Sequence, residues 1–461
     1  MFRQSVQEEN GITEGIIWKQ LLIFFFPILF GTFFQQLYNT VDAIVVGQFV
    51  GKEALAAVGG ATGTLINLLV GFFTGLSSGA TVIISQFYGA QKGEEVSRTV
   101  HSAVALCLAG GVLFTVTGNL CASWALRAMG TPENILGGAL TYLRVYFSGI
   151  IFPLIYNMGS GILRAVGDSR RPLYFLIVCC MVNLALDLLF VAVFRWGVLG
   201  VAVATLVSQA ISAALVILAL IKTDRSYHFD PHQIRFHTDL LKKIIRIGLP
   251  AGLQSVMYGL SNIVIQSAIN AFGTDVMAAW TAYGKIDGFF WMLMSAFGVS
   301  VTTFVGQNFG AQSYGRIRKS VRVSSGMALG TSLTLSVLLY FFGPYVYRLF
   351  TSDPVVIEQG MLILRTLTPT YFTYVAIEIL AGAVRGTGDA LIPMLITGIG
   401  VCVLRIVWIA LAVPVWPEVR TVVLSYPITW SVTSVLFILY YLQGGWLRRQ
   451  IAKAGYAPEV R

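Results

Sequence analysis

The sequence predicts an all-α protein that crosses a membrane many times, and three observations support this prediction. Of the 461 residues, 56% are hydrophobic and only 11% are charged, a composition outside the usual range of soluble globular chains. The mean hydropathy is +0.76. Long apolar stretches recur along the chain, and each reaches the ~20 residues that a helix needs to cross a bilayer.

We expect about twelve membrane-spanning helices. Their predicted ranges are 18–50, 55–88, 99–128, 137–165, 172–194, 196–221, 244–271, 276–309, 320–350, 355–384, 391–413 and 424–447. Several are longer than a bilayer requires, so tilted or kinked helices are expected. Pro27, Pro153, Pro250 and Pro369 fall inside these segments, and proline kinks a helix because it removes a backbone hydrogen bond.

The distribution of positive charge predicts the orientation. With the amino terminus inside, 22 Lys and Arg residues fall on the inner side, including Arg3 and Arg461. The outer side holds five: Lys52, Arg127, Arg195, Arg348 and Arg420. Positive residues concentrate in cytoplasmic loops. We therefore expect a multi-pass protein of the cytoplasmic (inner) membrane with both termini in the cytoplasm, and the net charge of +10 needs no nucleic-acid partner.

The chain repeats itself at a constant spacing. The repeated pairs are SQFYGAQ (85–91) with GQNFGAQ (306–312), LRAVGDSRRP (163–172) with VRGTGDALIP (384–393), and GKEALAA (51–57) with GTDVMAA (273–279). The matches keep their order at an offset of 221 or 222 residues. They predict two six-helix lobes, 1–221 and 240–461, related by a pseudo-two-fold axis along the membrane normal, as in transporters built from parallel repeats.

A polar segment, 222–239, joins the two predicted lobes and is expected to be cytoplasmic. It contains His228, His232 and His237. Two interpretations remain open from the sequence, a metal site and a solvated loop, and the second is favoured.

Asp42 is the only charged residue between Lys19 and Lys52. At 1.5 Å per helical residue it lies roughly 15 Å from the outer end of the first predicted helix. A carboxylate inside hydrocarbon costs at least ~3 kcal/mol, so such a residue usually faces protein or water and serves a function.

Three further polar residues fall at a similar depth in the same lobe. Asn183 and Asp187 are four residues apart and share one helix face. Asp187 lies roughly 12 Å and Thr205 about 14 Å from the outer ends of their helices. If these groups converge with Asp42, the two carboxylates either share a proton or hold a cation between them. Oxygen ligands of this kind suit Na⁺ or H⁺. No metal ion other than Na⁺ is expected.

The alternative is that Asn183 and Asp187 only hydrogen-bond neighbouring helices. At the equivalent positions of the second lobe the chain has Val264, Leu404, Trp408 and approximately Tyr426. None is acidic, so the ion site is expected once.

The second lobe contains other charges inside apolar segments. Lys285, Asp287, Arg365, Glu378 and Arg405 either meet a substrate or pair with one another. Aromatic residues and Met near them can bind flat organic cations through cation–π contacts and adaptable packing, although such residues also face lipid. The candidate substrate-cavity residues are Gln36, Tyr38, Asn39, Tyr258, Tyr283, Lys285, Asp287, Met292 and Glu378.

The pattern PxxxGxxxQQLYNTVDxxxVGxxxG (27–51), the repeated QxxGAQ segments and the LRAVGD/VRGTGD pair resemble the multidrug and toxic compound extrusion (MATE) transporters over essentially the whole chain. Asp42, Asn183, Asp187 and Thr205 look like the amino-lobe cation site of the DinF-like subgroup. The resemblance implies efflux of organic cations against inward Na⁺ or H⁺, with the first helix bending at Pro27. The NorM-like subgroup has acidic residues in helices seven and ten; here only helix ten has one, Glu378.

We therefore expect a secondary antiporter that exports amphipathic small-molecule cations by alternating access, as a monomer in the lipid bilayer and without a cofactor. A lipid-linked glycan flippase is the alternative, since Arg144, Lys285, Arg365 and Arg405 are available to bind pyrophosphate. An enzyme is not expected, because HExxH does not occur and GxSxG occurs only as GLSSG (75–79), inside a predicted membrane-spanning helix rather than at a strand-to-helix turn.

Overall fold

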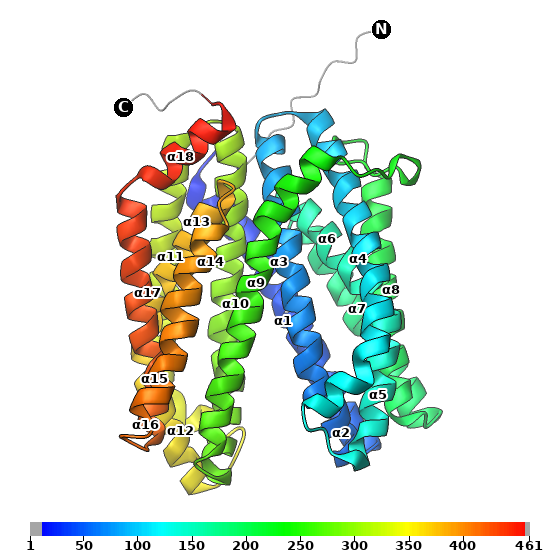
Figure 1. The fold of residues 1–461 in the computed structure, drawn as a ribbon, viewed down its shortest axis with the longest axis vertical. Coiled ribbons are helices and arrows are strands. Elements are labelled where there is room, and N and C mark those ends of the chain that lie inside the picture. Colours follow the sequence, from blue (N-terminus) through cyan, green and yellow to red (C-terminus); the bar gives the residue numbers. More distant parts are fainter. Residues whose placement is uncertain (1–11, 457–461) are drawn as a thin grey trace. The chain divides into compact units, whose positions relative to one another are not determined.

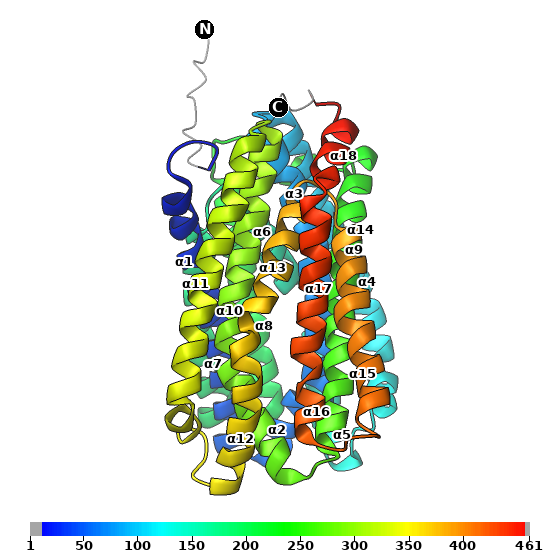
Figure 2. The same cartoon turned by 90° about the vertical axis from the view of Figure 1, so that its left-hand side faces the viewer.

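Helices make up all of the regular structure in the computed structural model, which describes residues 12–456 (Figures 1 and 2). In these residues ten helices are long and apolar enough to cross a membrane, or eleven if one bent pair is a single span. The prediction was about twelve. Helix α9 (Thr238–Asn270) has 33 residues, as many as α1 (Ile17–Phe49), but it is less apolar. The all-α multi-pass membrane class is confirmed.

The remaining elements follow in chain order. They are α2 (Lys52–Gly59), α3 (Ala61–Gly89), α4 (Gly93–Ala128), α5 (Glu133–Ser148), α6 (Ile151–Ala165), α7 (Arg170–Asp187), η1 (Leu188–Val193), α8 (Gly197–Ile221), η2 (Pro231–Gln233), α10 (Thr274–Gly310), α11 (Tyr314–Tyr347), α12 (Pro354–Leu367), η3 (Thr368–Thr370), α13 (Tyr371–Gly386), α14 (Leu391–Thr397), η4 (Gly398–Val403), α15 (Leu404–Ala412), α16 (Val419–Val423), α17 (Ser425–Leu442) and α18 (Gly445–Ala454). Both η1 and η4 are π-helical turns, whereas η2 and η3 are 3₁₀ turns.

Two predicted spans are interrupted. The segment 55–88 is split at Gly60 into α2 and α3, and 137–165 bends by 50° between α5 and α6. Glycine lies at both breaks, Gly60 and Gly149, where the absence of a side chain lets the backbone leave the helix at low cost. Apolar composition, which continues through each break, does not reveal them.

Two compact units make up the fold. The amino unit comprises Pro27–Ile84 and Gly93–Gly259, and the carboxy unit comprises the described residues up to Phe26, together with Ser85–Lys92 and the chain from Leu260 onward. Helix α1 therefore passes from one unit to the other between Phe26 and Pro27. The segment 222–239 belongs to the amino unit. The division into lobes 1–221 and 240–461 stays a prediction.

In the amino unit, α3 and α9 approach each other through glycines spaced four residues apart. Gly75 and Gly79 of α3 face Gly252 and Gly248 of α9. A Cβ atom at Gly79 would lie 2.7 Å from the backbone nitrogen of Gly248 and even closer to the carbonyl oxygen of Ile244. Small residues at this spacing let two membrane helices pack backbone to backbone.

In the carboxy unit, the repeated QxxGAQ segments pack against each other. A Cβ at Gly89 would collide with the carbonyl of Gln307, and a Cβ at Gly310 would collide with the carbonyl of Gln86. The Gln86 side chain also donates a 2.9 Å hydrogen bond to the carbonyl oxygen of Gly386. The two copies make equivalent contacts, so close backbone packing accounts for the glycine in each copy.

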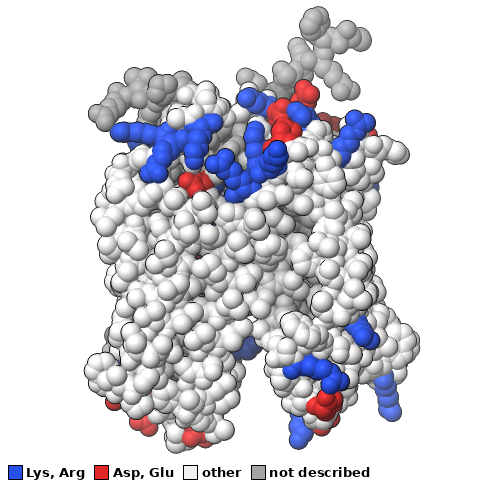
Figure 3. Space-filling view, viewed as in Figure 1, with Lys and Arg blue, Asp and Glu red and all other residues white. Residues whose placement is uncertain are grey.

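Lys and Arg side chains gather mainly at one end of each unit on the face shown in Figure 3. This is the clustering that the charge distribution along the sequence predicts. Arg3 and Arg461 lie outside the described residues. Which side of the membrane the basic ends face stays a prediction.

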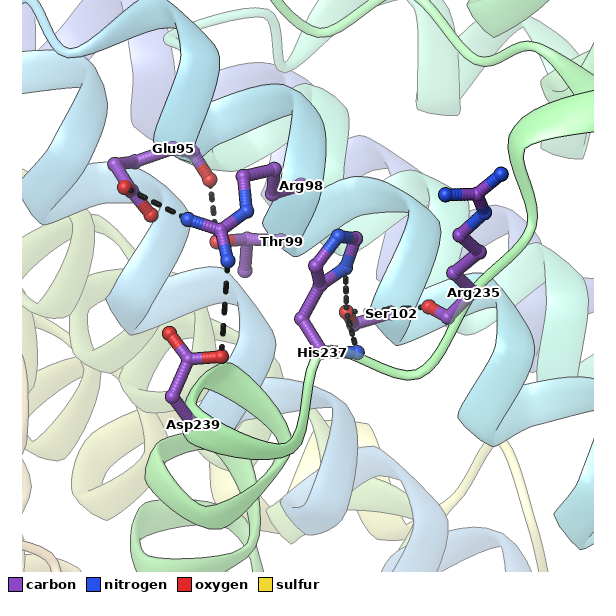
Figure 4. Close-up of polar contacts among 7 residues, drawn as sticks. All are labelled: Glu95, Arg98, Thr99, Ser102, Arg235, His237 and Asp239. Carbon is purple, nitrogen blue, oxygen red and sulfur yellow. Dashed lines mark hydrogen bonds and ion pairs between the residues drawn. The ribbon is translucent and has the colours of Figure 1, made fainter.

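The segment between Lys222 and Asp239 is fixed to α4 by hydrogen bonds, in part shown in Figure 4. The backbone N–H of Asp230 donates to His101 Nε2 (3.0 Å), and the backbone N–H of His237 donates to the hydroxyl of Ser102 (3.1 Å). Asp239 lies 3.8 Å from Arg98, which also pairs with Glu95. The polar linker is therefore an ordered part of the amino unit.

The three linker histidines have separate partners. His228 contacts the carbonyl of Thr223, His232 the carboxylate of Asp230, and His237 the hydroxyl of Ser102. No group of three metal-binding side chains occurs within residues 12–456. The backbone N–H of His232 donates to Asp230 and lowers the pKa of that carboxyl, so Asp230 acts as a capping acceptor for η2.

Ser102→Ala is expected to loosen the linker, because it removes the hydroxyl that bonds the backbone N–H and ring of His237. Hydrogen exchange of the backbone amides in 230–239 should accelerate by about fivefold or more, the equivalent of ~1 kcal/mol for one hydrogen bond. Mass spectrometry of the purified protein measures it. Ser97→Ala, five residues earlier in α4, is the control, and equal exchange in both variants would show that Ser102 does not hold the linker.

Candidate functional site

A cluster of buried polar residues from three helices of the amino unit forms the candidate site. Asp42 comes from α1, Asn183 and Asp187 from α7, and Thr205 from α8. Asn183 and Asp187 are fully buried, with 0% of their surface exposed, and Thr205 and Asp42 are 3% and 6% exposed. The four residues predicted from depth are thus brought together in one place.

The local helix geometry brings these groups to one point. Asn183 and Asp187 lie one turn apart on α7, and α7 changes into the π-helical turn η1 directly after Asp187. Turns of this kind occur often at functional sites because they redirect the side chains around them. The Thr205 hydroxyl donates to Asp42 Oδ2 at 3.4 Å, and Asp42 lies within interaction range of Asp187 and Asn183.

Most oxygen atoms of the cluster lack a hydrogen bond of ordinary geometry. Within the described residues, Asp42 Oδ1, both carboxyl oxygens of Asp187 and the amide oxygen of Asn183 are buried without one. Buried polar atoms are normally satisfied. Four such oxygen atoms around one point are a donor set that fits a hard cation such as Na⁺.

A cavity of about 140 Å³ opens next to this cluster. Its volume suits ions and water, since sites for drug-sized ligands measure at least ~300 Å³. Tyr38 and Asn39 line it, as predicted, but Gln36 does not; Gln35 takes that place. Tyr258, the other candidate in the amino unit, is also absent from its walls.

Several cavity residues were missed from the sequence. They are Asn67, Tyr142, Tyr146, Tyr156, Asn157 and Gln209, with Cys179 and Cys180. Gln209 follows Thr205 by four residues on α8, a spacing that could have identified it. The three tyrosines lie on α5 and α6, and only the tertiary fold brings these helices to the cavity.

Asp287, on α10 of the carboxy unit, is held by three neutral donors. Hydroxyls of Tyr283 and Tyr371 donate to its Oδ1 at 3.0 and 2.7 Å, and the indole N–H of Trp291 donates to its Oδ2 at 2.6 Å. Tyr283, Asp287 and Trp291 are spaced four apart on one helix face, whereas Tyr371 comes from α13. Aromatic rings pack around them, with the ring centroids of Phe290 and Tyr371 stacked 4.0 Å apart.

The other candidates of the carboxy unit do not join Asp287. Glu378 accepts a hydrogen bond from Tyr374 at 3.2 Å and packs against Gly298, Met292 is buried, and Lys285 is exposed. No ion pair joins Lys285 to Asp287 or Glu378 among the described residues, so the alternative in which Lys285 pairs with one of these acids is not observed. A role for Tyr283, Lys285, Asp287, Met292 and Glu378 in substrate binding stays a prediction.

A many-span helical fold with a buried polar cluster beside a small cavity is the architecture of a membrane transporter. The MatE family model matches residues 27–189 and 250–411, more than half of the chain. The chain belongs to the MATE family of transporters, and it is therefore a multi-pass membrane protein of a family that transports rather than catalyses a reaction.

Curated relatives cover nearly the whole chain. The sequence is 27% identical to "Probable multidrug resistance protein YoeA" of Bacillus subtilis, over 95% of this chain and 96% of the relative. It is 29% identical to "Probable multidrug resistance protein YpnP" of the same organism, over 94% and 97%. A "FAD transporter" of Shewanella oneidensis is 24% identical over 77% and 78%. Multidrug resistance and FAD transport are thus the roles named among these relatives.

Solved structures share the fold. An outward-facing MATE transporter of the MOP superfamily superimposes with a TM-score of 0.89 at 23% identity, over 97% of this chain and 100% of that one. A MOP superfamily transporter from Pyrococcus furiosus gives 0.88 at 24% identity, over 98% and 100%.

Proposed function

We propose that this protein is a secondary antiporter of the DinF-like type, which exports amphipathic organic cations and is driven by inward H⁺ or Na⁺. The observation that carries the proposal is the buried cluster of Asp42, Asn183, Asp187 and Thr205, which fits one small cation. The resemblance of the first-helix motif and the multidrug resistance relatives support the exported substrate class.

Of the two coupling ions, Na⁺ fits the cluster better. A shared proton supplies one O–H donor and so satisfies one further oxygen, whereas four oxygen atoms of the cluster are without a hydrogen bond. A Na⁺ ion contacts several oxygens at once and neutralises part of the charge of two carboxylates. When bound, it would be held by Asp42, Asp187 and the amide oxygen of Asn183.

Pro27 is the proposed hinge of the transport cycle. The proline lies in α1, and the change from the carboxy unit to the amino unit falls between Phe26 and Pro27. Because proline removes one backbone hydrogen bond of the helix, bending there costs less than elsewhere. Asp42 is on the same helix, so a cation bound to it has a direct mechanical connection to the bend.

The glycan flippase alternative has less support. The cavity of the amino unit is lined by no Lys or Arg, although pyrophosphate recognition requires several. Of the four candidate basic residues, Arg144, Lys285 and Arg365 are exposed and only Arg405 is buried.

Transport by the purified protein in proteoliposomes tests the antiporter proposal. An inward Na⁺ gradient or an inward H⁺ gradient is imposed separately, and efflux of the cationic dye ethidium is followed by fluorescence. We expect efflux above that of protein-free liposomes with at least one gradient, and a larger effect of Na⁺. Absence of dye movement with both gradients would contradict the proposal.

A further inference from the structure

Arg405 is a buried cation without a protein anion. It lies on α15 of the carboxy unit, directly after the π-helical turn η4, and 2% of its surface is exposed. Its guanidinium carbon lies 4.0 Å from the centre of the Tyr426 ring of α17. Its Nε makes no hydrogen bond, and within residues 12–456 no carboxylate lies within ion-pair distance.

This arrangement is costly unless an anion completes it. A guanidinium does not lose its proton in proteins, and burying an unpaired charge is strongly unfavourable. Stacking on one aromatic ring recovers a smaller amount of free energy. The Tyr426 ring therefore offsets only part of the cost.

Two acidic residues within long helices of the same unit, Asp287 of α10 and Glu378 of α13, are engaged elsewhere. The carboxylate of Asp287 is held by Tyr283, Tyr371 and Trp291. Glu378 accepts a hydrogen bond from its own helix neighbour, Tyr374. Neither acid supplies a counter-charge to the guanidinium.

Aromatic side chains extend from Arg405 along the interior of the unit. The Tyr426 ring lies 5.4 Å from that of Trp430 and 6.0 Å from that of Trp280. Tyr426 and Trp280 are both partly exposed. A planar guanidinium next to partly open aromatic faces is the combination that binds a flat ring carrying a carboxylate, because the ring stacks while the carboxylate accepts two parallel N–H donors.

We propose that Arg405 is the centre of an anion-binding site in the carboxy unit that takes the carboxylate of a planar aromatic acid. The site is separate from the cation cluster around Asp42 and does not depend on the proposed antiport. It widens the ligands of this protein from organic cations to compounds that carry an anionic group.

Equilibrium dialysis with the full chain in phosphatidylcholine nanodiscs tests the proposal. The probes are 2-naphthoate and 2-naphthamide, which share a ring system and differ in charge. The wild-type protein is expected to bind the acid about tenfold or more tightly than the amide, because charge-assisted hydrogen bonds contribute more than neutral ones. In Arg405→Gln this preference should disappear.

Arg365→Gln is the matched control. Arg365 also lies over an aromatic ring of the carboxy unit, 5.7 Å from the centre of Tyr340, but it is exposed. Its loss should leave the preference for the acid unchanged, which separates Arg405 from the general basic charge of the protein. Arg405→Lys keeps the charge without the two parallel donors, and we expect it to retain part of the preference.

Two results would overturn the proposal. One is equal binding of the acid and the amide by the wild-type protein, a comparison that requires no variant. The other is an unchanged preference for the acid in the Arg405→Gln variant, when that variant elutes as a folded species in gel filtration. If that variant does not fold, the comparison of acid and amide in the wild-type protein decides alone.

Discussion

Asp42→Asn is expected to abolish gradient-driven transport. Asn keeps the shape of the side chain but removes its negative charge, and it places an N–H₂ group where a cation would need an oxygen. Loss of a charge-assisted contact of this kind weakens cation binding by more than about tenfold. In proteoliposomes with an inward Na⁺ gradient, ethidium efflux should fall to the rate of protein-free liposomes, and equilibrium binding of ²²Na⁺ should be lost in parallel.

Asp275→Asn is the control for this experiment, since Asp275 is an exposed acid in the first turn of α10 and should retain full transport. Asp187→Asn is expected to impair Na⁺ binding as well, and the double variant should be no worse than either single variant because the two carboxylates act on the same ion. Normal coupling in folded Asp42→Asn would refute the proposed site.

Much of the candidate site was predictable because depth in a membrane helix follows from residue counting. Asp42, Asp187 and Thr205 were placed at one depth from 1.5 Å per residue, and the structure brings them together. What counting does not supply is the neighbouring helix. Tyr142 of α5, Tyr156 of α6 and Asn67 of α3 line the same cavity, but their positions depend on helix packing.

The carboxy unit shows the same limit of prediction from sequence. The spacing of Tyr283, Asp287 and Trp291 on one face of α10 was visible in the sequence, yet a carboxylate among aromatic residues suggested substrate binding. The third donor, Tyr371, comes from α13 and helps satisfy the carboxylate. Arg405 was one of several candidate charges, and only its burial against Tyr426 sets it apart from exposed Arg144 and Arg365.

Gly79→Val is expected to prevent correct folding of the amino unit. Any Cβ at this position meets the backbone of α9 at Ile244 and Gly248, and backbone atoms cannot rotate away as a flexible side chain can. Overpacking of a well-packed interior typically costs 1–3 kcal/mol, and we expect about 3 kcal/mol or more here because the two γ-methyl groups of Val add to the clash. Thermal unfolding followed by intrinsic fluorescence in detergent should show a markedly lower midpoint, with aggregation in gel filtration.

Gly137→Val provides the matched comparison, because Gly137 lies inside α5 of the same unit and a Cβ there would meet no atom within 4 Å. Both substitutions carry the same change in helix propensity, which is below ~1 kcal/mol, so the difference between their midpoints reports the α3–α9 contact alone. Gly248→Val, on the facing helix, should reproduce the defect of Gly79→Val. Equal midpoints for Gly79→Val and Gly137→Val would mean that α3 and α9 do not pack through these glycines.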